Sequence, residues 1–258
     1  DDLWRRCGGV DMTFDNFDRL MQRQDRVLIV PEGVPGIGKG FDKRYRLQPF
    51  SSSFAVMAAR HGAPVTPVHI VNAEWVMPLN VTFAVVDRIA QLVGLPFFPL
   101  PAGFLVLVLP WMLYLSLPAR MVVVVGEPID VAARVRAAGV RDGDREGMRA
   151  IAAGVRTEMQ ADLDRLVASH GARPYDAKSL LRGFRDARGH RSRFLPWMWP
   201  LRFVRHDRDR KRPAARGRLH RWLRDLDVLA FHVPFGWLIL ALTRRWRRPP
   251  HGYRGLDR

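Results

Sequence analysis

One cysteine, Cys7, occurs among the 258 residues, so the chain cannot form an internal disulfide. This scarcity fits a reducing compartment. Lysine is also scarce, because only four of the 42 basic residues are Lys, and no internal repeat is visible. The first residue is Asp1 rather than Met, and we expect the chain to be an N-terminal truncation of a longer protein.

Positive charge is concentrated toward the C-terminus. Residues 1–181 carry 21 Lys and Arg against 19 Asp and Glu, whereas residues 182–258 carry 21 against 6. Tryptophan and phenylalanine are interleaved with the arginines between residues 182 and 224. Segments of this kind bind anionic lipid or nucleic acid. We expect this one to anchor the chain on an anionic membrane surface, and nucleic acid is the disfavoured partner.

Two long stretches lack charged side chains. Residues 89–119 are interrupted by five prolines, and residues 228–243 are interrupted by His232 and Pro234. The longest run with one internal proline, 102–117, has 16 residues, fewer than the roughly 20 that a spanning helix needs. Arg244–Arg248, with a central Trp, follows the second stretch and suits a bilayer interface. We expect peripheral binding on the cytoplasmic face of a membrane; a core helix with a solvated end is the alternative.

Short apolar runs alternate with amphipathic patterns along the first 170 residues. This alternation predicts an α/β fold with a mixed, largely parallel sheet flanked by helices, followed by a basic, membrane-associating extension over residues 171–258. The expected strands are Val27–Val30, Val65–Val71, Val81–Val86 and Arg120–Val125. The expected helices are Phe14–Arg23, the stretch from the serines at 51–53 to about His61, and Asp144–Ser169.

The first predicted strand ends abruptly in Pro31-Glu32-Gly33. A carboxylate at the carboxyl end of a buried strand lies where open α/β sheets bind ligands. The stretch Gly33–Gly40, expected to be a loop, also matches the G-x-x-x-x-G-K pattern of a phosphate-binding loop. Gly40 stands where that pattern needs Ser or Thr, and no helix is expected directly after it. A nucleotide hydrolase is therefore kept only as an alternative.

Four short motifs occur in one order, and the set is more specific than any single member. They are GGV at 8–10, VLIVPEGVPGIGKGFDKRYRLQPF at 27–50, HGAPVTPVHIVNAE at 61–74 and VVVVGEPIDV at 122–131. Over about residues 3–135 the chain resembles the glycerolipid acyltransferase superfamily, in particular its 1-acylglycerol-3-phosphate and diacylglycerol acyltransferase-like branch. The resemblance implies a glycerol-phosphate-acyltransferase-like domain over residues 1–170.

The same resemblance implies an O-acyltransferase that moves a fatty acyl group from acyl-CoA or acyl carrier protein to a hydroxyl of a glycerolipid, such as a lysophospholipid. Acyl-CoA would be a co-substrate, and neither a cofactor nor a metal is implied. In the family a His-x-x-x-x-Asp pair supplies the general base, and it precedes the GGV element, so we expect it before Asp1. The formal match at His220–Asp225 lies on the wrong side of the Pro-Glu-Gly element. A non-catalytic lipid-binding module is the alternative.

Acceptor binding is assigned by the resemblance to Pro31, Glu32 and Gly33, which match the family's block residue for residue. Glu32 would orient the polar group of the acceptor; the alternative is a strand-end carboxylate that caps local amides. Pro67 fits the family's strand-shaping proline near the pocket, and Asn72 replaces the Gly usual in that motif.

The positions that grip phosphate in glycerol-phosphate acyltransferases differ in this chain. Pro35 stands where the family has an Arg three residues beyond the Glu, and Phe14 lies near the place of an earlier Arg. The basic residues that could replace those charges are Lys39, Lys43, Arg44 and Arg46. Acceptors with a phosphate and neutral lipid alcohols therefore both stay open.

Overall fold

The computed structural model describes residues 8–78, 80–81, 83–92, 94, 98, 100–141, 143–190, 195–211, 223 and 225–243. The strands are β1 (Val68–Val71), β2 (Asn80–Val81), β3 (Leu100–Pro101) and β4 (Val122–Val125). The helices are α2 (Phe14–Gln22), α3 (Gly33–Gly38), α4 (Ser53–His61), α5 (Ala84–Leu92), α6 (Ala102–Val108), α7 (Val131–Ala137), α8 (Arg145–His170), α9 (Ala177–Asp186), α10 (Trp199–Lys211) and α12 (Trp237–Thr243). The shorter 3-10 helices are η1 (Phe41–Lys43), η2 (Ala73–Val76), η3 (Pro110–Tyr114), η5 (Pro196–Met198) and η6 (Leu226–His232).

Three helices expected from capping residues and periodicity are confirmed. Thr13 caps α2 by accepting a hydrogen bond from the backbone N–H of Asn16. Gly62, in the left-handed region, ends α4. Asp144 caps α8 by accepting from the backbone N–H of Gly147. Local sequence determined these boundaries because each cap satisfies backbone groups that a helix end leaves unpaired.

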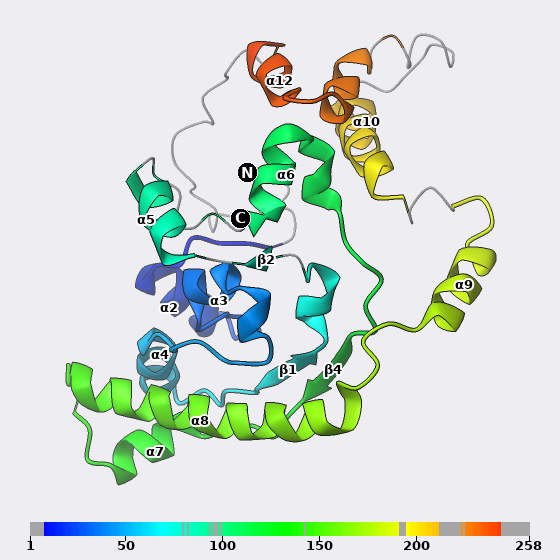
Figure 1. Cartoon of the computed structure of the whole chain (residues 1–258). Coiled ribbons are helices and arrows are strands. Elements are labelled where there is room, and N and C mark those ends of the chain that lie inside the picture. Colours follow the sequence, from blue (N-terminus) through cyan, green and yellow to red (C-terminus); the bar gives the residue numbers. More distant parts are fainter. Residues whose placement is uncertain are drawn as a thin grey trace.

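The core is formed by α4, α7 and α8. Its buried side chains come from all three helices and are Phe54, Ala55, Ala58, Val131, Val135, Met148, Ala152 and Val155. α8 also lies along one face of the ribbon formed by β1 and β4 (Figure 1). Six of the eight core side chains are Ala or Val, and small side chains on facing helices let the helices approach closely.

β1 and β4 form an antiparallel pair with Val68 opposite Val125 and Val71 opposite Val122. His69 and Val71 point to the α8 side and are buried, whereas Val68 and Ile70 are exposed on the other face. β2 and β3 form a second antiparallel pair. Both sheets in the described ranges are thus two-stranded and antiparallel. The largely parallel sheet stays a prediction.

Two of the expected strands are wrong. Val27–Val30 forms no strand; Leu28 is 84% and Val30 64% exposed, and only Ile29 packs against the core. The apolar composition of this run misled the prediction, because no neighbouring strand among the described residues covers it. Val81–Val86 is split between β2 and the start of α5. A short apolar run does not distinguish a strand from a helix.

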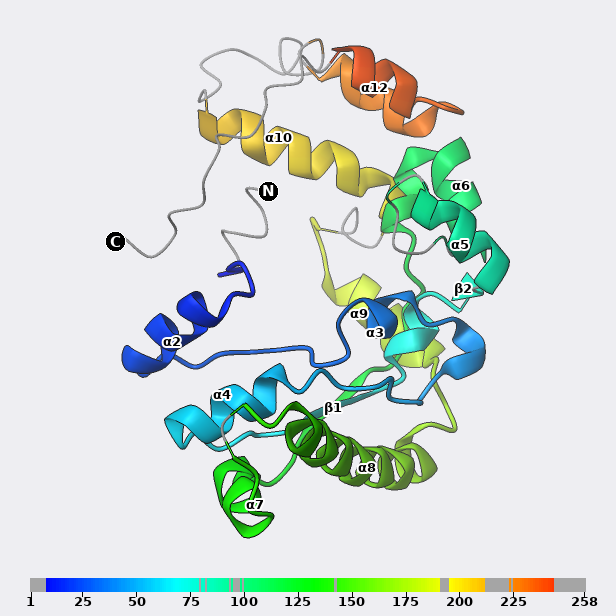
Figure 2. The same cartoon turned by 90° about the vertical axis from the view of Figure 1, so that its left-hand side faces the viewer.

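The segment after α8 contains helices, although residues 191–194, 212–222, 224 and 244–258 lie outside the described part. α9 leads away from the core, and η5, α10, η6 and α12 follow it. η5, α10 and η6 pack against η3, α12 packs against η6, and η3 packs against α6. We call these six elements together the helical lobe. The lobe lies at the end of the molecule opposite α7 and α8 in both views (Figures 1 and 2).

The expected division at residue 170 coincides with the end of α8. However, α6 and η3 precede that boundary and still pack with the C-terminal helices. Within the described ranges, none of the helices combines the length and the apolar character that crossing a membrane requires.

His69 makes the stability of this fold depend on acid. Its Nε2 atom is buried, lies 4.0 Å from Asp162 Oδ2 and has no hydrogen-bond partner among the described residues. Burial lowers the pKa of the imidazole, and the Asp162 carboxylate opposes this in part. The native state therefore holds the neutral ring, and its contribution is complete above the unfolded pKa of about 6.5 and decreases as the pH falls toward the native pKa.

We expect His69→Gln to lose less stability than the wild type when the pH is lowered from about 7 to 5, because the variant has no ring to protonate. Urea unfolding at both pH values measures this. The exposed His206→Gln is the matched control and should keep the acid dependence of the wild type. Equal acid dependence in wild type and His69→Gln would contradict the assignment.

Candidate functional site

The Pro31-Glu32-Gly33 turn is anchored at both ends by backbone hydrogen bonds. The N–H of Gly33 donates to the Val30 carbonyl at 3.1 Å, and the N–H of Ser51 donates to the Pro31 carbonyl at 2.8 Å. Gly33 has φ +57°, a left-handed conformation that side chains beyond Gly seldom adopt. The turn is therefore tied to the start of α4, and its glycine is required by its backbone geometry.

The carboxylate of Glu32 is half-buried and folds over the first turn of α3. A side chain at Gly36 would bring its Cβ to 2.6 Å from Glu32 Oε2, so the glycine makes room for this rotamer. Glu32 does not cap α3 through its side chain. In the described part of the chain its carboxylate has no hydrogen bond or ion pair, so both oxygens can accept from a ligand.

The expected loop at Gly33–Gly40 begins with α3, which covers Gly33–Gly38, so that expectation is wrong over these residues. A phosphate-binding loop needs open backbone N–H groups followed by a helix, whereas here the glycines themselves are helical. The lysine of the pattern, Lys39, follows α3 and is engaged elsewhere. This geometry disfavours the nucleotide-hydrolase alternative.

Lys39 is ion-paired with Glu74, with 3.0 Å between Nζ and Oε1. The side chains are only 13% and 18% exposed. Lys39 Nζ also donates to the Arg46 carbonyl at 3.2 Å, and the N–H of Tyr45 donates to the same Glu74 oxygen at 3.0 Å. Lys39 therefore contacts both the Arg46 end of this segment and η2. The sequence had suggested instead that Lys39 binds a phosphate group.

The other predicted cations face solvent. Lys43, Arg44 and Arg46 are exposed. The Arg44 guanidinium carbon lies 4.9 Å from the Phe41 ring centre and 5.8 Å from that of Trp75, and these two rings are in edge contact. Among the described residues neither arginine forms an ion pair, so both can meet an anionic group.

Asn72 connects three separate segments. It is fully buried and has φ +69°, a backbone conformation that Gly and Asn adopt more readily than other residues. Asn can therefore stand where the acyltransferase family that the chain resembles has Gly. Its Nδ2 donates to the carbonyls of Arg120 and His170 at 3.1 and 3.3 Å, and its Oδ1 accepts from the Tyr45 hydroxyl.

Tyr45 also has a positive φ, +60°, which is uncommon for a bulky residue. Four contacts hold it there: its N–H donates to Glu74, its carbonyl accepts from Gln160 Nε2 at 2.8 Å, and its hydroxyl contacts Asn72 and accepts from Trp75 Nε1 at 2.8 Å. Burial is the largest cause that raises the pKa of the phenol. The sequence did not point to Tyr45 or to Glu74 as residues of the site. A positive φ and a contact between residues 29 apart in the chain leave no local sequence pattern.

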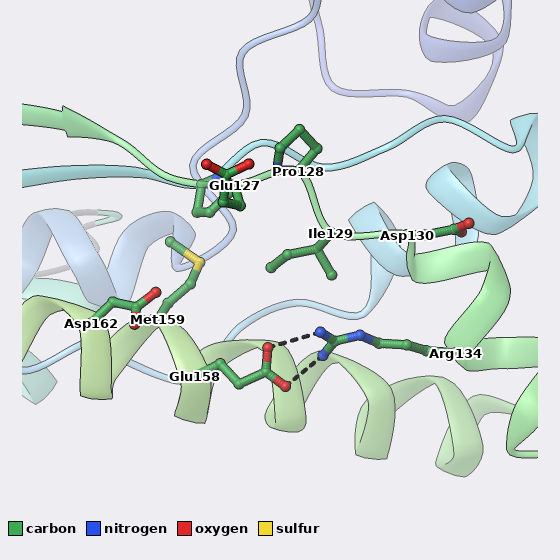
Figure 3. A pocket seen from close by; sticks show the side chains of 9 residues that line it. Glu127, Pro128, Ile129, Asp130, Arg134, Glu158, Met159 and Asp162 are labelled. Atoms are coloured by element: carbon green, nitrogen blue, oxygen red, sulfur yellow. Dashed lines mark hydrogen bonds and ion pairs between the residues drawn. The ribbon is translucent and has the colours of Figure 1, made fainter.

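Pro67 is buried and lines a cavity of about 340 Å³ between the end of the ribbon, α7 and α8 (Figure 3). None of the other predicted site residues lines this cavity. Its walls carry Glu127, Asp130, Glu158 and Asp162, and Arg134 forms a two-pronged pair with Glu158 at 2.6 and 2.8 Å. The structure therefore does not bring Pro67 together with Glu32 in one cavity.

Within the described ranges, no group of three or more His, Cys, Asp or Glu side chains is arranged to hold a metal ion. His220 of the formal His-x-x-x-x-Asp match lies outside the described residues. Asp225 is buried and accepts hydrogen bonds from Arg205 and Arg208 at 2.9 and 3.0 Å. Its contacts are those of an anchor in the helical lobe.

A second imidazole–carboxylate contact joins α2 to α4. His61 Nε2 lies 2.7 Å from Asp18 Oδ1, and Arg60 reaches the other oxygen of the same carboxylate at 3.4 Å. His61 is the last residue of α4, where a cation or an N–H donor is favoured by the helix dipole. This contact fixes the position of α2 on the core.

The chain is similar to proteins of three mycobacterial species. A protein of Mycobacterium bovis and one found in two strains of Mycobacterium tuberculosis are 35% identical to it over 134 residues, which cover 50% of this chain and 35% of theirs. A Mycobacterium leprae protein is 33% identical over 134 residues, covering 48% of this chain and 33% of its own. All four are named as uncharacterized proteins. The matched region spans about a third of the length of these curated relatives. No family profile and no solved structure matches the chain.

Replacing Lys39 should destabilise the protein. Lys39→Ala leaves the Glu74 carboxylate buried without its cation, and we expect a loss of about 3 kcal/mol in the free energy of unfolding. Urea unfolding measures the loss, and the exposed Lys43→Ala should stay within about 0.5 kcal/mol of the wild type. The double change Lys39→Met with Glu74→Gln should recover part of the loss. Equal effects of the two single lysine changes would contradict the role given to Lys39.

Two substitutions at Asn72 separate its hydrogen bonds from its backbone strain. Asn72→Gly keeps the left-handed conformation but removes the amide, and we expect a loss of about 2–3 kcal/mol. Asn72→Ala removes the same bonds and adds strain at positive φ, so it should cost about 1 kcal/mol more. Equal losses in urea unfolding would show that the backbone at this residue is not under constraint.

Proposed function

We propose that this chain supplies the acceptor-binding part of an O-acyltransferase, which moves a fatty acyl group from acyl-CoA or acyl carrier protein to a hydroxyl of a glycerolipid such as a lysophospholipid. The observation that carries the proposal is the layout of residues 31–46. Counting partners among the described residues alone, a carboxylate without an ion pair, Glu32, lies near one end, and two exposed arginines without ion pairs, Arg44 and Arg46, lie near the other. The Lys39–Glu74 pair holds this segment in place.

Opposite charges at the two ends of the segment suit the two polar parts of a lysophospholipid. Glu32 can accept a hydrogen bond from a glycerol hydroxyl, which is a donor. A phosphate would be repelled by that carboxylate and attracted to Arg44 and Arg46, whose guanidinium groups match phosphate geometry. A neutral lipid alcohol would use Glu32 and leave the arginines unoccupied, so the two acceptor classes differ in their dependence on Arg46.

The reaction itself breaks a thioester and forms an ester. The acceptor hydroxyl oxygen attacks the thioester carbonyl carbon, the carbon–sulfur bond breaks, and the thiol of CoA or of the carrier protein leaves. A general base takes the hydroxyl proton and passes one to the departing sulfur. The proposal gives Glu32 the task of orienting the acceptor, and it assigns the base to a His-x-x-x-x-Asp pair as the resemblance implies.

A lipid-binding module without turnover is the second candidate, because the roles proposed for Glu32, Arg44 and Arg46 are in binding the acceptor. It shares the acceptor contacts with the first candidate but predicts no release of thiol. The names of the mycobacterial relatives state no activity and favour neither.

We expect Glu32→Gln to weaken binding of lysophosphatidic acid and of monoacylglycerol roughly tenfold to a hundredfold, because a charge-assisted hydrogen bond is lost. Titration calorimetry measures the binding, and release of CoA thiol from a long-chain acyl-CoA measures turnover. Asp42→Asn, an exposed acidic residue of η1, is the matched control and should change neither. Arg46→Gln should affect only the phosphate-bearing acceptor.

Wild-type binding and turnover in Glu32→Gln would remove the assignment of that carboxylate. Binding of both lipids without any thiol release from acyl-CoA would favour the lipid-binding module over the transferase. Loss of binding in Glu32→Gln and Asp42→Asn alike would point to net charge rather than to a site.

A further inference from the structure

The two charge-free stretches of the sequence meet in the helical lobe. The N–H of Phe235 donates to the Val108 carbonyl at 2.6 Å, and Trp237 Nε1 donates to the Leu107 carbonyl at 2.9 Å. Trp111 and Trp197 are in edge contact with ring centres 6.2 Å apart. Segments more than a hundred residues apart in sequence therefore form one body, seen at the end of the molecule away from α8 (Figure 2).

Charged side chains lie inside this lobe. The Asp225 side chain is 2% exposed and accepts hydrogen bonds from Arg205 and Arg208, and Arg208 also reaches Asp227 at 2.5 Å. These ion pairs tie α10 to η6. The carboxylate of Asp225 is therefore paired inside the lobe, whereas the side chain of Asp227 is 39% exposed.

Apolar side chains lie outside it. In α12 Leu238 is 49% and Leu242 86% exposed. Further exposed residues come from α6, η3, η6 and the turn before α12, and they are Phe104, Leu107, Leu113, Leu229, Val233 and Phe235. Several exposed apolar side chains on the elements of one lobe are typical of an interaction surface.

The sequence on either side of these C-terminal elements is rich in arginine. Arg244–Arg248 follows directly on Thr243, the last residue of α12, and includes Trp246. The residues from Arg212 to Arg224 contain five arginines and no acidic residue. The arginines of both runs lie outside the described residues; in the sequence they adjoin α10 and α12. Arginine and tryptophan next to an apolar helix fit the charge and polarity profile of an anionic bilayer surface.

We propose that the helical lobe inserts α12 and the exposed residues of α6 and η3 into one leaflet of an anionic membrane, whose negative charge complements the arginine-rich sequence that adjoins α10 and α12. A seven-residue helix is about 10 Å long, a third of the hydrocarbon thickness of about 30 Å, so this contact stays within one leaflet. The inference goes beyond the proposed acyl transfer and holds whether or not the chain has that activity.

Vesicle flotation of the full chain tests this surface. The probes are vesicles of phosphatidylcholine alone and of phosphatidylcholine with phosphatidylglycerol. We expect the wild type to bind the anionic vesicles and Leu238→Ser with Leu242→Ser to bind them roughly tenfold to a hundredfold more weakly, because two leucines no longer leave water. Both leucines are exposed, so circular dichroism and Tm should stay at the wild-type values.

The matched control is Leu180→Ser with Leu181→Ser in α9, an amphipathic helix outside the lobe. It should bind within about twofold of the wild type. Bromine-labelled lipid chains should quench the tryptophan fluorescence of the wild type. Part of the vesicle binding should persist at high salt, because salt does not screen the insertion of apolar side chains.

Equal vesicle binding of the lobe variant and the wild type would overturn the proposal, and so would a wild type that ignores anionic vesicles. A second copy of the chain as the occupant would instead give a dimer by light scattering without lipid, which Leu238→Ser with Leu242→Ser would dissociate. Binding that disappears entirely at high salt and does not depend on the leucines would assign the contact to the arginines alone.

Discussion

The ion pair between Lys39 and Glu74 is the contact on which the arrangement of the candidate site depends. One carboxylate oxygen accepts from the lysine and from the backbone of Tyr45, so a single residue of η2 holds both ends of the 39–45 stretch. Both side chains are largely shielded from water, which makes the pair costly to break. Tyr45 and Asn72 can keep their left-handed backbones because this contact and its neighbours over-determine their positions.

The two ends of the molecule differ in which side chains they bury. Around α8 the core is composed largely of small and β-branched residues, and the ribbon of β1 and β4 lies on that helix. In the helical lobe the Asp225 carboxylate is buried, its arginine partners reach solvent, and leucines face outward. The first arrangement places apolar side chains inside, whereas the second leaves leucines exposed, and this difference is the basis of the proposed membrane contact.

Helix boundaries were predictable where a cap and a period of 3.6 residues agree. Asp144 with the apolar positions from Met148 to Leu166 predicted α8 almost to the residue, since both signals are local. Val27–Val30 shows the limit of such signals. A β-branched run predicts a strand only if another strand lies beside it, and pairing is a property of the tertiary structure. The site was predicted in part: the turn at Glu32 was found, but Lys39 proved to be a structural partner of Glu74.

By itself the sequence determined the caps and periodicity of α2, α4 and α8, the uneven distribution of charge, and the order of the short motifs, because each depends on neighbouring residues. Only the tertiary structure decided that Lys39 is neutralised, that Asn72 joins three segments, that the cavity lined by Pro67 does not include Glu32, and that two distant apolar stretches form one lobe. These outcomes depend on contacts between residues far apart in the chain, and composition and spacing carry no record of which partners meet.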